Sequence, residues 1–444
     1  FPLLVSMALP NVISMLVNSL YNIVDSLFVA RISEDAMTAL SLVFPIQNFS
    51  NAIAIGFGIG INAMIALYLG AGDREKAETA ATHGFVLSLV HGVVMMVVSI
   101  AIMPGFLRRF TQDETLIAAG ITYSTIVFLF LVVNMVSLAF EKIFQAVGRM
   151  KVSMVALITG CVCNILLDPV LIFGLGPVPA MGIAGAALAT GIGQAATLVI
   201  YLVVYSTTES PVHLRRKALR PNLSLEGRLY AIGVPAILNL ALPSLLVTFL
   251  NGLLAAFSES YVVVLGIYYK LQTFLYLPAN GIVQGMRPLI GYNYGARKPD
   301  RVKKTIKCAM FYAEAIMLVG FLLFQFLPDK LLGLFSASEA MLAIGKPALR
   351  IICFHFLLAG MSIILSSTFQ ALGNGMFSLI ISVCRQLVVL LPAAWLLSKT
   401  GNVNMVWWSF IIAELVSVTL SFVFFARLDK KIIEPMYDNA AAAQ

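Results

Sequence analysis

The sequence predicts an all-α integral membrane protein with twelve transmembrane helices in two six-helix lobes. Apolar residues make up 60% of its 444 residues, and charged residues only 11%. Apolar runs of about 20 residues, long enough to cross a bilayer core, recur along the whole chain. The first half of the chain is also repeated in the second. Helices satisfy their own backbone groups in lipid, whereas the strands of a barrel would be shorter and would alternate in polarity.

The apolar runs place twelve spans along the chain. In order, they are expected at 2–29, 36–67, 79–104, 115–146, 150–173, 182–205, 226–256, 261–292, 304–327, 340–372, 376–398 and 404–427. The first span is too long and too polar to be a cleaved signal peptide. The chain starts at Phe1 instead of a methionine, so an N-terminal segment is expected to precede it.

The placement of positive charge orients the chain. If successive loops lie on alternate sides, one side holds sixteen Lys and Arg residues and the other holds five. The positive-inside rule then puts both termini in the cytoplasm. This asymmetry accounts for the net charge of +8, so no nucleic-acid partner is expected. The five cysteines include no CxxC pair and are expected to be free thiols.

A shift of 225 residues aligns the sequence with itself, without a gap, over about 140 residues. Pro10 then meets Pro235, and FQAVG (Phe144–Gly148) meets FQALG (Phe369–Gly373). Because each copy holds an even number of spans, the two copies are parallel repeats. Two such bundles with a cleft between them are what alternating access requires. The repeat therefore favours a transporter over a receptor or a membrane enzyme.

The repeat also sets the expected domain organisation. It consists of an N-terminal six-helix lobe (1–207), a cytoplasmic connecting loop (208–225), a C-terminal six-helix lobe (226–432) and a tail (433–444) that ends in an added, alanine-rich sequence.

One face of the first span is polar. On a helical wheel six of its polar residues share an arc of about 100°. They are Asn11, Ser14, Asn18, Tyr21, Asn22 and Asp25. Such a stripe faces a bundle interior or a wet cavity, and an aspartate at mid-bilayer costs about 2.5–3.5 kcal/mol on insertion scales. Pro10 is expected to bend the same helix and to act as its hinge. The alternative is an Asp25 that reaches the interface, since Arg31 follows six residues later.

A second acid lies in the fifth span. Asn164 and Asp168 are spaced i, i+4 and share a helix face, and the sixth span places Thr190 among small residues. Two carboxylates, an amide oxygen and a hydroxyl are hard oxygen ligands that suit Na⁺, or H⁺ shared between the acids. At the repeat shift Asp25 corresponds to Leu250, and Asp168 likewise has no acidic counterpart. The scaffold is repeated but the acids are not, which indicates a functional site.

Several motifs together carry a family resemblance. They are YNIVD (21–25), GAGDREKA (70–77), FQAVGRMK (144–151), NILLDP (164–169), GIAGAALAT (182–190), GYNYGARKPDRV (291–302) and FQALGNG (369–375). In order and spacing they resemble the multidrug and toxic compound extrusion (MATE) family, in its prokaryotic DinF-like and MepA-like branch. The resemblance covers nearly all of the chain. It implies two six-helix lobes around a V-shaped cleft, and export of amphiphilic, often cationic drugs against Na⁺ or H⁺.

The resemblance also implies where the coupling ion binds. The cation or proton site of this branch matches Asp25, Asn164, Asp168 and Thr190. The supporting network is expected to include Tyr21, Asn18, Asn22 and Tyr123. Another branch, resembling NorM, uses acids in the seventh and tenth spans. Those spans here hold only Glu226, at the start of the seventh, which favours coupling in the N-terminal lobe.

Other charged residues have two interpretations each. Lys270 and Arg287 could line the cleft or could snorkel to the interface. Glu314 and Glu414 are expected to pair with a basic group. His83, His91 and His355 are expected to be core histidines, since they lack metal-ligand spacing.

The sequence therefore predicts a secondary active antiporter that exports amphiphilic, cationic drugs in exchange for H⁺ or Na⁺. No P-loop, dinucleotide fingerprint or nucleophile motif is found, so neither an enzyme nor a cofactor is expected. The protein is expected to act as a monomer in a prokaryotic inner membrane, with drugs and the lipid bilayer as its partners. The alternative is a lipid-linked saccharide flippase of the same superfamily, which an arginine-lined cleft would support.

Overall fold

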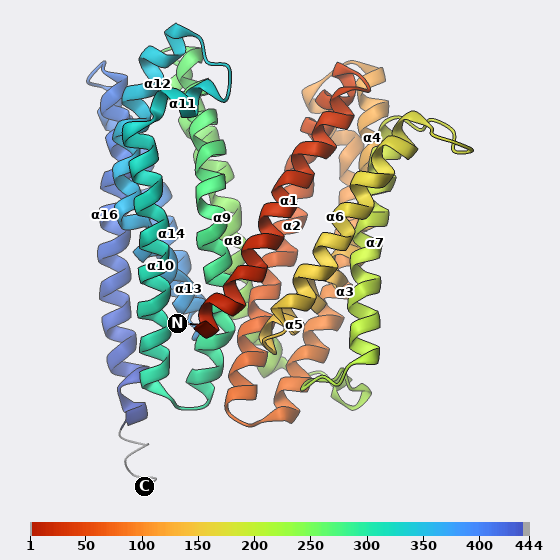
Figure 1. Ribbon diagram of the computed structural model, residues 1–444, viewed down its shortest axis with the longest axis vertical. Coiled ribbons are helices and arrows are strands. Elements are labelled where there is room, and N and C mark those ends of the chain that lie inside the picture. Colours follow the sequence, from red (N-terminus) through yellow and green to blue (C-terminus); the bar gives the residue numbers. More distant parts are fainter. Residues whose placement is uncertain (1, 438–444) are drawn as a thin grey trace. The chain divides into compact units, whose positions relative to one another are not determined.

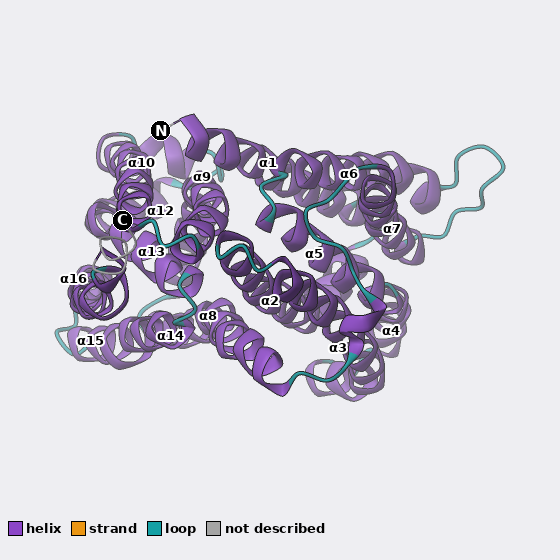
Figure 2. Ribbon diagram, turned by 90° about the horizontal axis from the view of Figure 1, so that it is seen from below, coloured by secondary structure: helices purple, strands orange, loops and turns teal. Residues whose placement is uncertain are grey.

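The computed structural model describes residues 2–437, and these residues form helices and loops only (Figures 1 and 2). Contacts divide the chain into two compact units. The N-terminal unit comprises Pro10–Tyr68 and Asp73–Tyr230, and the C-terminal unit comprises the residues up to Leu9, Leu69–Gly72 and the chain from Ala231 on. The connecting loop predicted at 208–225 thus groups with the N-terminal unit. Residues 438–444 of the predicted tail lie outside the described part.

The first seven helices and one 3₁₀ turn precede the second repeat. They are α1 (Pro2–Ala30), α2 (Glu34–Gly70), α3 (Arg74–Phe110), α4 (Glu114–Leu129), α5 (Leu131–Ala146), α6 (Met150–Phe173), α7 (Ile183–Thr207) and η1 (Arg216–Leu219). Side-chain caps explain two of the starts, because Asp73 accepts from the backbone N–H of Lys76 and Asp113 accepts from that of Thr115. Gly174 ends α6 in the left-handed conformation.

The second repeat is more broken. Its elements are α8 (Leu223–Ala255), α9 (Glu259–Gly295), α10 (Pro299–Phe326), α11 (Pro328–Gly333), α12 (Glu339–Ile352), η2 (Cys353–His355), α13 (Phe356–Ala371), α14 (Gly375–Val383), η3 (Cys384–Leu390), α15 (Leu391–Ser398), α16 (Val403–Leu428) and η4 (Asp429–Ile433). A π-helical turn, η3, precedes Pro392, which has no N–H to continue the ladder. The described residues contain eleven helices long and apolar enough to span a membrane, or twelve if one bent pair counts as a span.

The bent pair is the predicted fourth span. It divides at Phe130 into α4 and α5, which meet at an angle of 42°. The ring of Phe130 lies against Gly191 of α7, where an added Cβ would come within 2.2 Å of a ring carbon. The span expected at 115–146 is therefore present, as a bent pair of helices instead of one straight helix. The fold class is confirmed, since the spans otherwise follow the predicted order.

Glycines bring α6 and α7 side by side (Figures 1 and 2). A Cβ on Gly160 would lie 2.7 Å from the carbonyl oxygen of Gly193, and one on Gly185 would lie 2.4 Å from that of Leu171. Small residues allow such close backbone approach between membrane helices. The close packing sets the distance between the polar residues of α6 and those of α7.

This packing leads to a stability prediction for Gly185→Ala. In an exposed helix the change would stabilise by about 1 kcal/mol. Here the new Cβ meets the backbone of Leu171, so we expect a loss of about 1–3 kcal/mol. Thermal unfolding of the purified protein measures it. Gly105→Ala is the matched control, since its Cβ meets no atom within 4 Å. A Gly185→Ala protein as stable as the wild type would contradict the packing argument.

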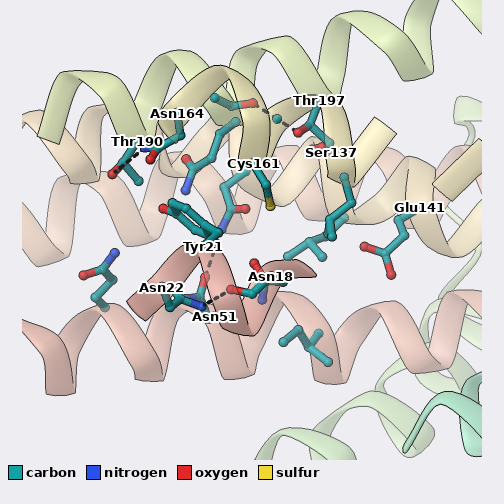
Figure 3. A pocket seen from close by; sticks show the side chains of 18 of the residues that line it. Asn18, Tyr21, Asn22, Asn51, Ser137, Glu141, Cys161, Asn164, Thr190 and Thr197 are labelled. Carbon is teal, nitrogen blue, oxygen red and sulfur yellow. Dashed lines mark hydrogen bonds between the residues drawn. The ribbon is translucent and has the colours of Figure 1, made fainter. Parts of the chain in front are cut away.

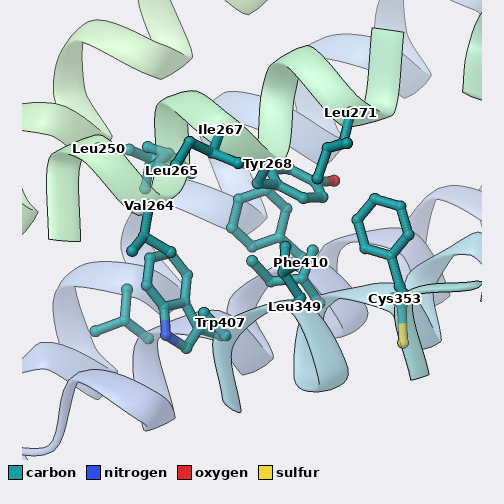
Figure 4. Close-up of a cluster of buried hydrophobic side chains, with 14 of the residues drawn as sticks. Leu250, Val264, Leu265, Ile267, Tyr268, Leu271, Leu349, Cys353, Trp407 and Phe410 are labelled. Atoms are coloured by element: carbon teal, nitrogen blue, oxygen red, sulfur yellow. The ribbon is translucent and has the colours of Figure 1, made fainter. Parts of the chain in front are cut away.

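The C-terminal unit has a large aromatic core (Figure 4). Tyr268 is fully buried, stacks on Phe356 with ring centroids 6.5 Å apart, and meets Phe410 edge-on at 5.6 Å. Its hydroxyl hydrogen-bonds to Nε2 of His355 at 2.7 Å. His355 is thus a core histidine, as expected. Trp407 belongs to the same buried cluster as Tyr268, Phe356 and Phe410.

Charged groups hold the connecting loop against α3. His83 lies 2.8 Å from a carboxylate oxygen of Glu226 and 2.8 Å from the carbonyl oxygen of Ala218. Glu78, which is 1% exposed, pairs with Arg215 at 2.5 Å. These contacts lie within the N-terminal unit and give the connecting loop a defined position on it.

Candidate functional site

The N-terminal unit contains an open cavity of about 340 Å³ (Figure 3). The cavity is lined from α1, α2, α5, α6 and α7, and its volume is near the lower end of the range for small-molecule sites. The polar face predicted for the first span opens onto it through Asn18, Tyr21 and Asn22. Asn22 donates to the backbone carbonyl of Asn18 at 2.8 Å.

One end of the cavity is formed by a hydrogen-bonded pair across α6 and α7. Nδ2 of Asn164 donates to Oγ1 of Thr190 at 3.3 Å, and Thr190 donates to the carbonyl oxygen of Ala186 at 3.1 Å. Both side chains are buried, and Oδ1 of Asn164 has no hydrogen-bond partner. Figure 3 shows the ring of Tyr21 on the same side of the cavity as this pair. The free amide oxygen is therefore an available ligand.

The two predicted acids lie next to this end. Asp168 is one helical turn beyond Asn164 and is fully buried, and neither of its carboxylate oxygens has a hydrogen-bond partner. Oδ1 of Asp25 is also buried without a partner. The carboxyl groups are close enough for their charges to interact. In the described residues Arg31 forms no ion pair with Asp25, and the interface alternative for this acid stays a prediction.

This arrangement has a chemical consequence. Removing a bare carboxylate from water is strongly unfavourable, and two neighbouring carboxylates also repel each other. No lysine or arginine in the described part of the chain forms an ion pair with either acid. A proton or a monovalent cation would supply the missing positive charge. The donor set of carboxylate, amide and hydroxyl oxygens fits Na⁺ better than a transition metal.

The structure brings most of the predicted site residues together. Tyr123 is buried, and its hydroxyl lies within electrostatic range of Asp25, Asp168 and Tyr21. The whole predicted set from α1, α4, α6 and α7 thus lies in one region of the N-terminal unit. Their role in binding the coupling ion stays a prediction.

The two residues that could line the cleft belong to the C-terminal unit, and that role stays a prediction. Lys270 belongs to α9 in the C-terminal unit, where its Nζ is 5.8 Å from the ring centre of Phe335. Arg287, also in α9, donates to Oε1 of Gln370 at 2.9 Å. Neither residue lines the cavity of Figure 3.

The predicted pairing of the two intramembrane glutamates is half right. Glu414 lies 3.3 Å from Nη1 of Arg385, as expected of an acid that pairs with a base. Glu314 accepts from the backbone N–H of Met361 at 2.7 Å and has no basic partner in the described residues, so that expectation is wrong. A backbone N–H group thus provides the Glu314 carboxylate with a hydrogen bond in place of a basic side chain.

Sequence reasoning missed the other end of the cavity. Glu141 lines it, pairs with Nζ of Lys142 at 2.7 Å and accepts from Gln145 at 2.8 Å. Lys142 also donates to Gln145 at 3.1 Å. The available signal was an adjacent acid and base inside an apolar span, followed by the glutamine of the repeated FQAVG motif.

Carboxamides on α2 and α5 were also missed. Asn134 donates to Oδ1 of Asn51 at 2.9 Å, and Gln47 lies one turn before Asn51 on the same cavity face. The i, i+4 spacing of Gln47 and Asn51 in an apolar run was the signal that could have found them.

Comparisons with known proteins agree with this architecture. The MatE family model matches residues 10–170 and again 235–396. The multidrug export protein MepA of Staphylococcus haemolyticus (strain JCSC1435) is 28% identical over 95% of this chain and 92% of its own length. MepA of Staphylococcus aureus (strain MRSA252) is 25% identical over 93% of this chain and 91% of its own length. A solved structure of MATE in complex with MaL6 is 25% identical, has a TM-score of 0.89 and covers 98% of this chain and 97% of its own.

Proposed function

Because the chain belongs to the MatE family of membrane transporters, we propose that it is a secondary active antiporter exporting amphiphilic, cationic drugs in exchange for H⁺ or Na⁺. Relatives that match nearly its whole length carry the name multidrug export protein. The observation that carries the ion coupling is the pair of neighbouring acids: both carboxylate oxygens of the buried Asp168 and Oδ1 of the partly buried Asp25 lack a hydrogen-bond partner, and neither acid has a basic partner in the described residues. The family consists of transporters, and the chain is not an enzyme.

The proposed ion site includes Asp25 of α1, a helix that runs from one unit into the other. The residues of α1 up to Leu9 group with the C-terminal unit, and those from Pro10 on group with the N-terminal unit. Pro10 breaks the hydrogen-bond ladder of α1 at this boundary. A cation or proton between Asp25 and Asp168 would hold α1 to α6, and its release would free α1 to bend at Pro10. The coupling ion would thereby act on a helix that has residues in both units.

Export then requires only that drug and ion prefer different states of the protein. The two ligands need not touch, because a differential affinity for two conformations is enough to couple them. An ion gradient provides the driving force, at about 2.3 kcal/mol per charge for each 100 mV.

The membrane context follows from the family and from the spans. The chain is a multi-pass membrane protein, and its bacterial relatives place it in the plasma membrane. We further propose that both termini are cytoplasmic and that the protein works as a monomer without a cofactor.

Transport by the wild-type protein under single gradients tests the proposed coupling. Inverted vesicles that contain the protein take up ethidium, and we expect uptake to follow either an imposed H⁺ gradient or an imposed Na⁺ gradient. Vesicles without the protein are the control. Collapse of the active gradient by an ionophore should stop uptake. Uptake that persists without either gradient would contradict antiport.

A further inference from the structure

The lining of the N-terminal cavity is unusual for a membrane protein. Eight of its nineteen lining residues carry carboxamide side chains, and four more carry hydroxyls, one of them the phenol of Tyr21. Tyr21 is the one aromatic residue among the nineteen, so the cavity offers little of the ring and methionine surface on which lipophilic cations bind. Hydrogen bonding is therefore the main interaction that this cavity can offer to a ligand.

Part of this hydrogen-bonding capacity is not used by the protein. Asn134 and Asn51 bond to each other, and Asn164 bonds to Thr190. The side chains of Asn18, Asn48 and Gln194 make no hydrogen bond to any residue in the described range 2–437. They come from α1, α2 and α7, so three of the helices that line the cavity offer unused donors and acceptors.

The cavity also presents no unpaired charge. Glu141 is its sole charged lining residue, and it is neutralised by Lys142 at 2.7 Å. An apolar group that entered the cavity would strip water from the carboxamides without replacing its hydrogen bonds, which is unfavourable. A phosphate group would need a free base, and Lys142 is already paired. The cavity is thus suited to a ligand group that is uncharged and rich in both donors and acceptors.

We propose that this cavity binds the hydroxyl-rich, uncharged end of a glycosylated amphiphile. Each sugar hydroxyl donates and accepts, as each carboxamide does, so the two match at many positions. Tyr21 supplies one ring face against which a sugar can pack. The proposal rests on the export function above and adds amphiphiles with a sugar-like end to its substrates. A lipid-linked saccharide shares the sugar but adds a phosphate, which the paired state of Lys142 disfavours.

Equilibrium binding tests this directly, with the full-length protein in lipid nanodiscs free of glycoside detergents. The probes are 4-methylumbelliferyl β-D-glucoside and 4-methylumbelliferone methyl ether, which share the coumarin ring and are both uncharged. We expect the glucoside to bind at least about tenfold more tightly, the size of one or two net hydrogen bonds. Binding needs no ion gradient, so failure of the antiport proposal would not affect this result.

Variants locate the binding. Asn48→Leu and Gln194→Leu should each weaken glucoside binding by about tenfold and leave the methyl ether unchanged. Asn404→Leu, which removes a carboxamide from α16 outside the cavity, is the matched control. Thermal unfolding establishes that each variant is folded. Equal binding of the two coumarins, or equal losses for both in the leucine variants, would overturn the proposal. Displacement of the glucoside by glucosyl farnesyl phosphate more strongly than by unlabelled methyl glucoside would also overturn it.

Discussion

Asp168→Asn is expected to abolish ion-coupled transport while leaving the protein folded. Asparagine has nearly the shape of the acid but cannot bind a proton or balance the charge of a cation. Asp168 is fully buried and both of its oxygens lack partners, so nothing in the described structure requires its charge for packing. We expect ethidium uptake into inverted vesicles to fall by about 100-fold. A factor of this size lies in the upper part of the usual range of coupling between two ligands. Asp25→Asn should have the same effect.

Two further measurements separate coupling from folding. Addition of ethidium to vesicles that hold a preformed gradient should dissipate that gradient with the wild type and not with Asp168→Asn. Asp35→Asn, at an exposed position at the start of α2, is the control and should behave as the wild type. If both asparagine variants transport at the wild-type rate, the acids are structural and the coupling mechanism is wrong.

Lys142→Met is expected to cause the largest loss of stability. Lys142 is 5% exposed and contacts both Glu141 and Gln145, and its removal would leave the Glu141 carboxylate without its counter-ion. Breaking a buried ion pair from one side costs about 3–5 kcal/mol, because the remaining charge stays desolvated. Denaturation of the purified protein should therefore begin at a clearly lower temperature, and expression should fall.

The double variant Lys142→Met with Glu141→Gln is the matched control. It removes both charges and keeps the side-chain volumes, so it should recover most of the stability lost by Lys142→Met alone. If the double variant is no more stable than Lys142→Met, then Lys142 acts through its packing rather than through the charge of Glu141.

Much of the fold could be predicted because its determinants are local in the sequence. A run of apolar residues spans a membrane whatever its neighbours are, and the 225-residue repeat is visible by comparing the chain with itself. The break at Phe130 could not be predicted in this way. The ring at the break packs against Gly191, which is 61 residues later and on another helix.

The same division applies to the candidate site. The sequence by itself determined which polar residues lie on one face of α1 and which share a face of α6, because the helical period places residues four apart together. It also determined that the acids are absent from the second repeat. These features were sufficient to predict Asp25, Asn164, Asp168 and Thr190 as a group.

Only the tertiary structure decided which helices meet. Asn164 and Thr190 are hydrogen-bonded because glycines at Gly160 and Gly193 let α6 and α7 pack closely. The cavity, with Glu141 at one end, exists because five helices leave space between them at that level. Contacts of this kind depend on the shapes of side chains that are far apart in the chain. A periodic pattern along one helix carries no information about the helix that packs against it.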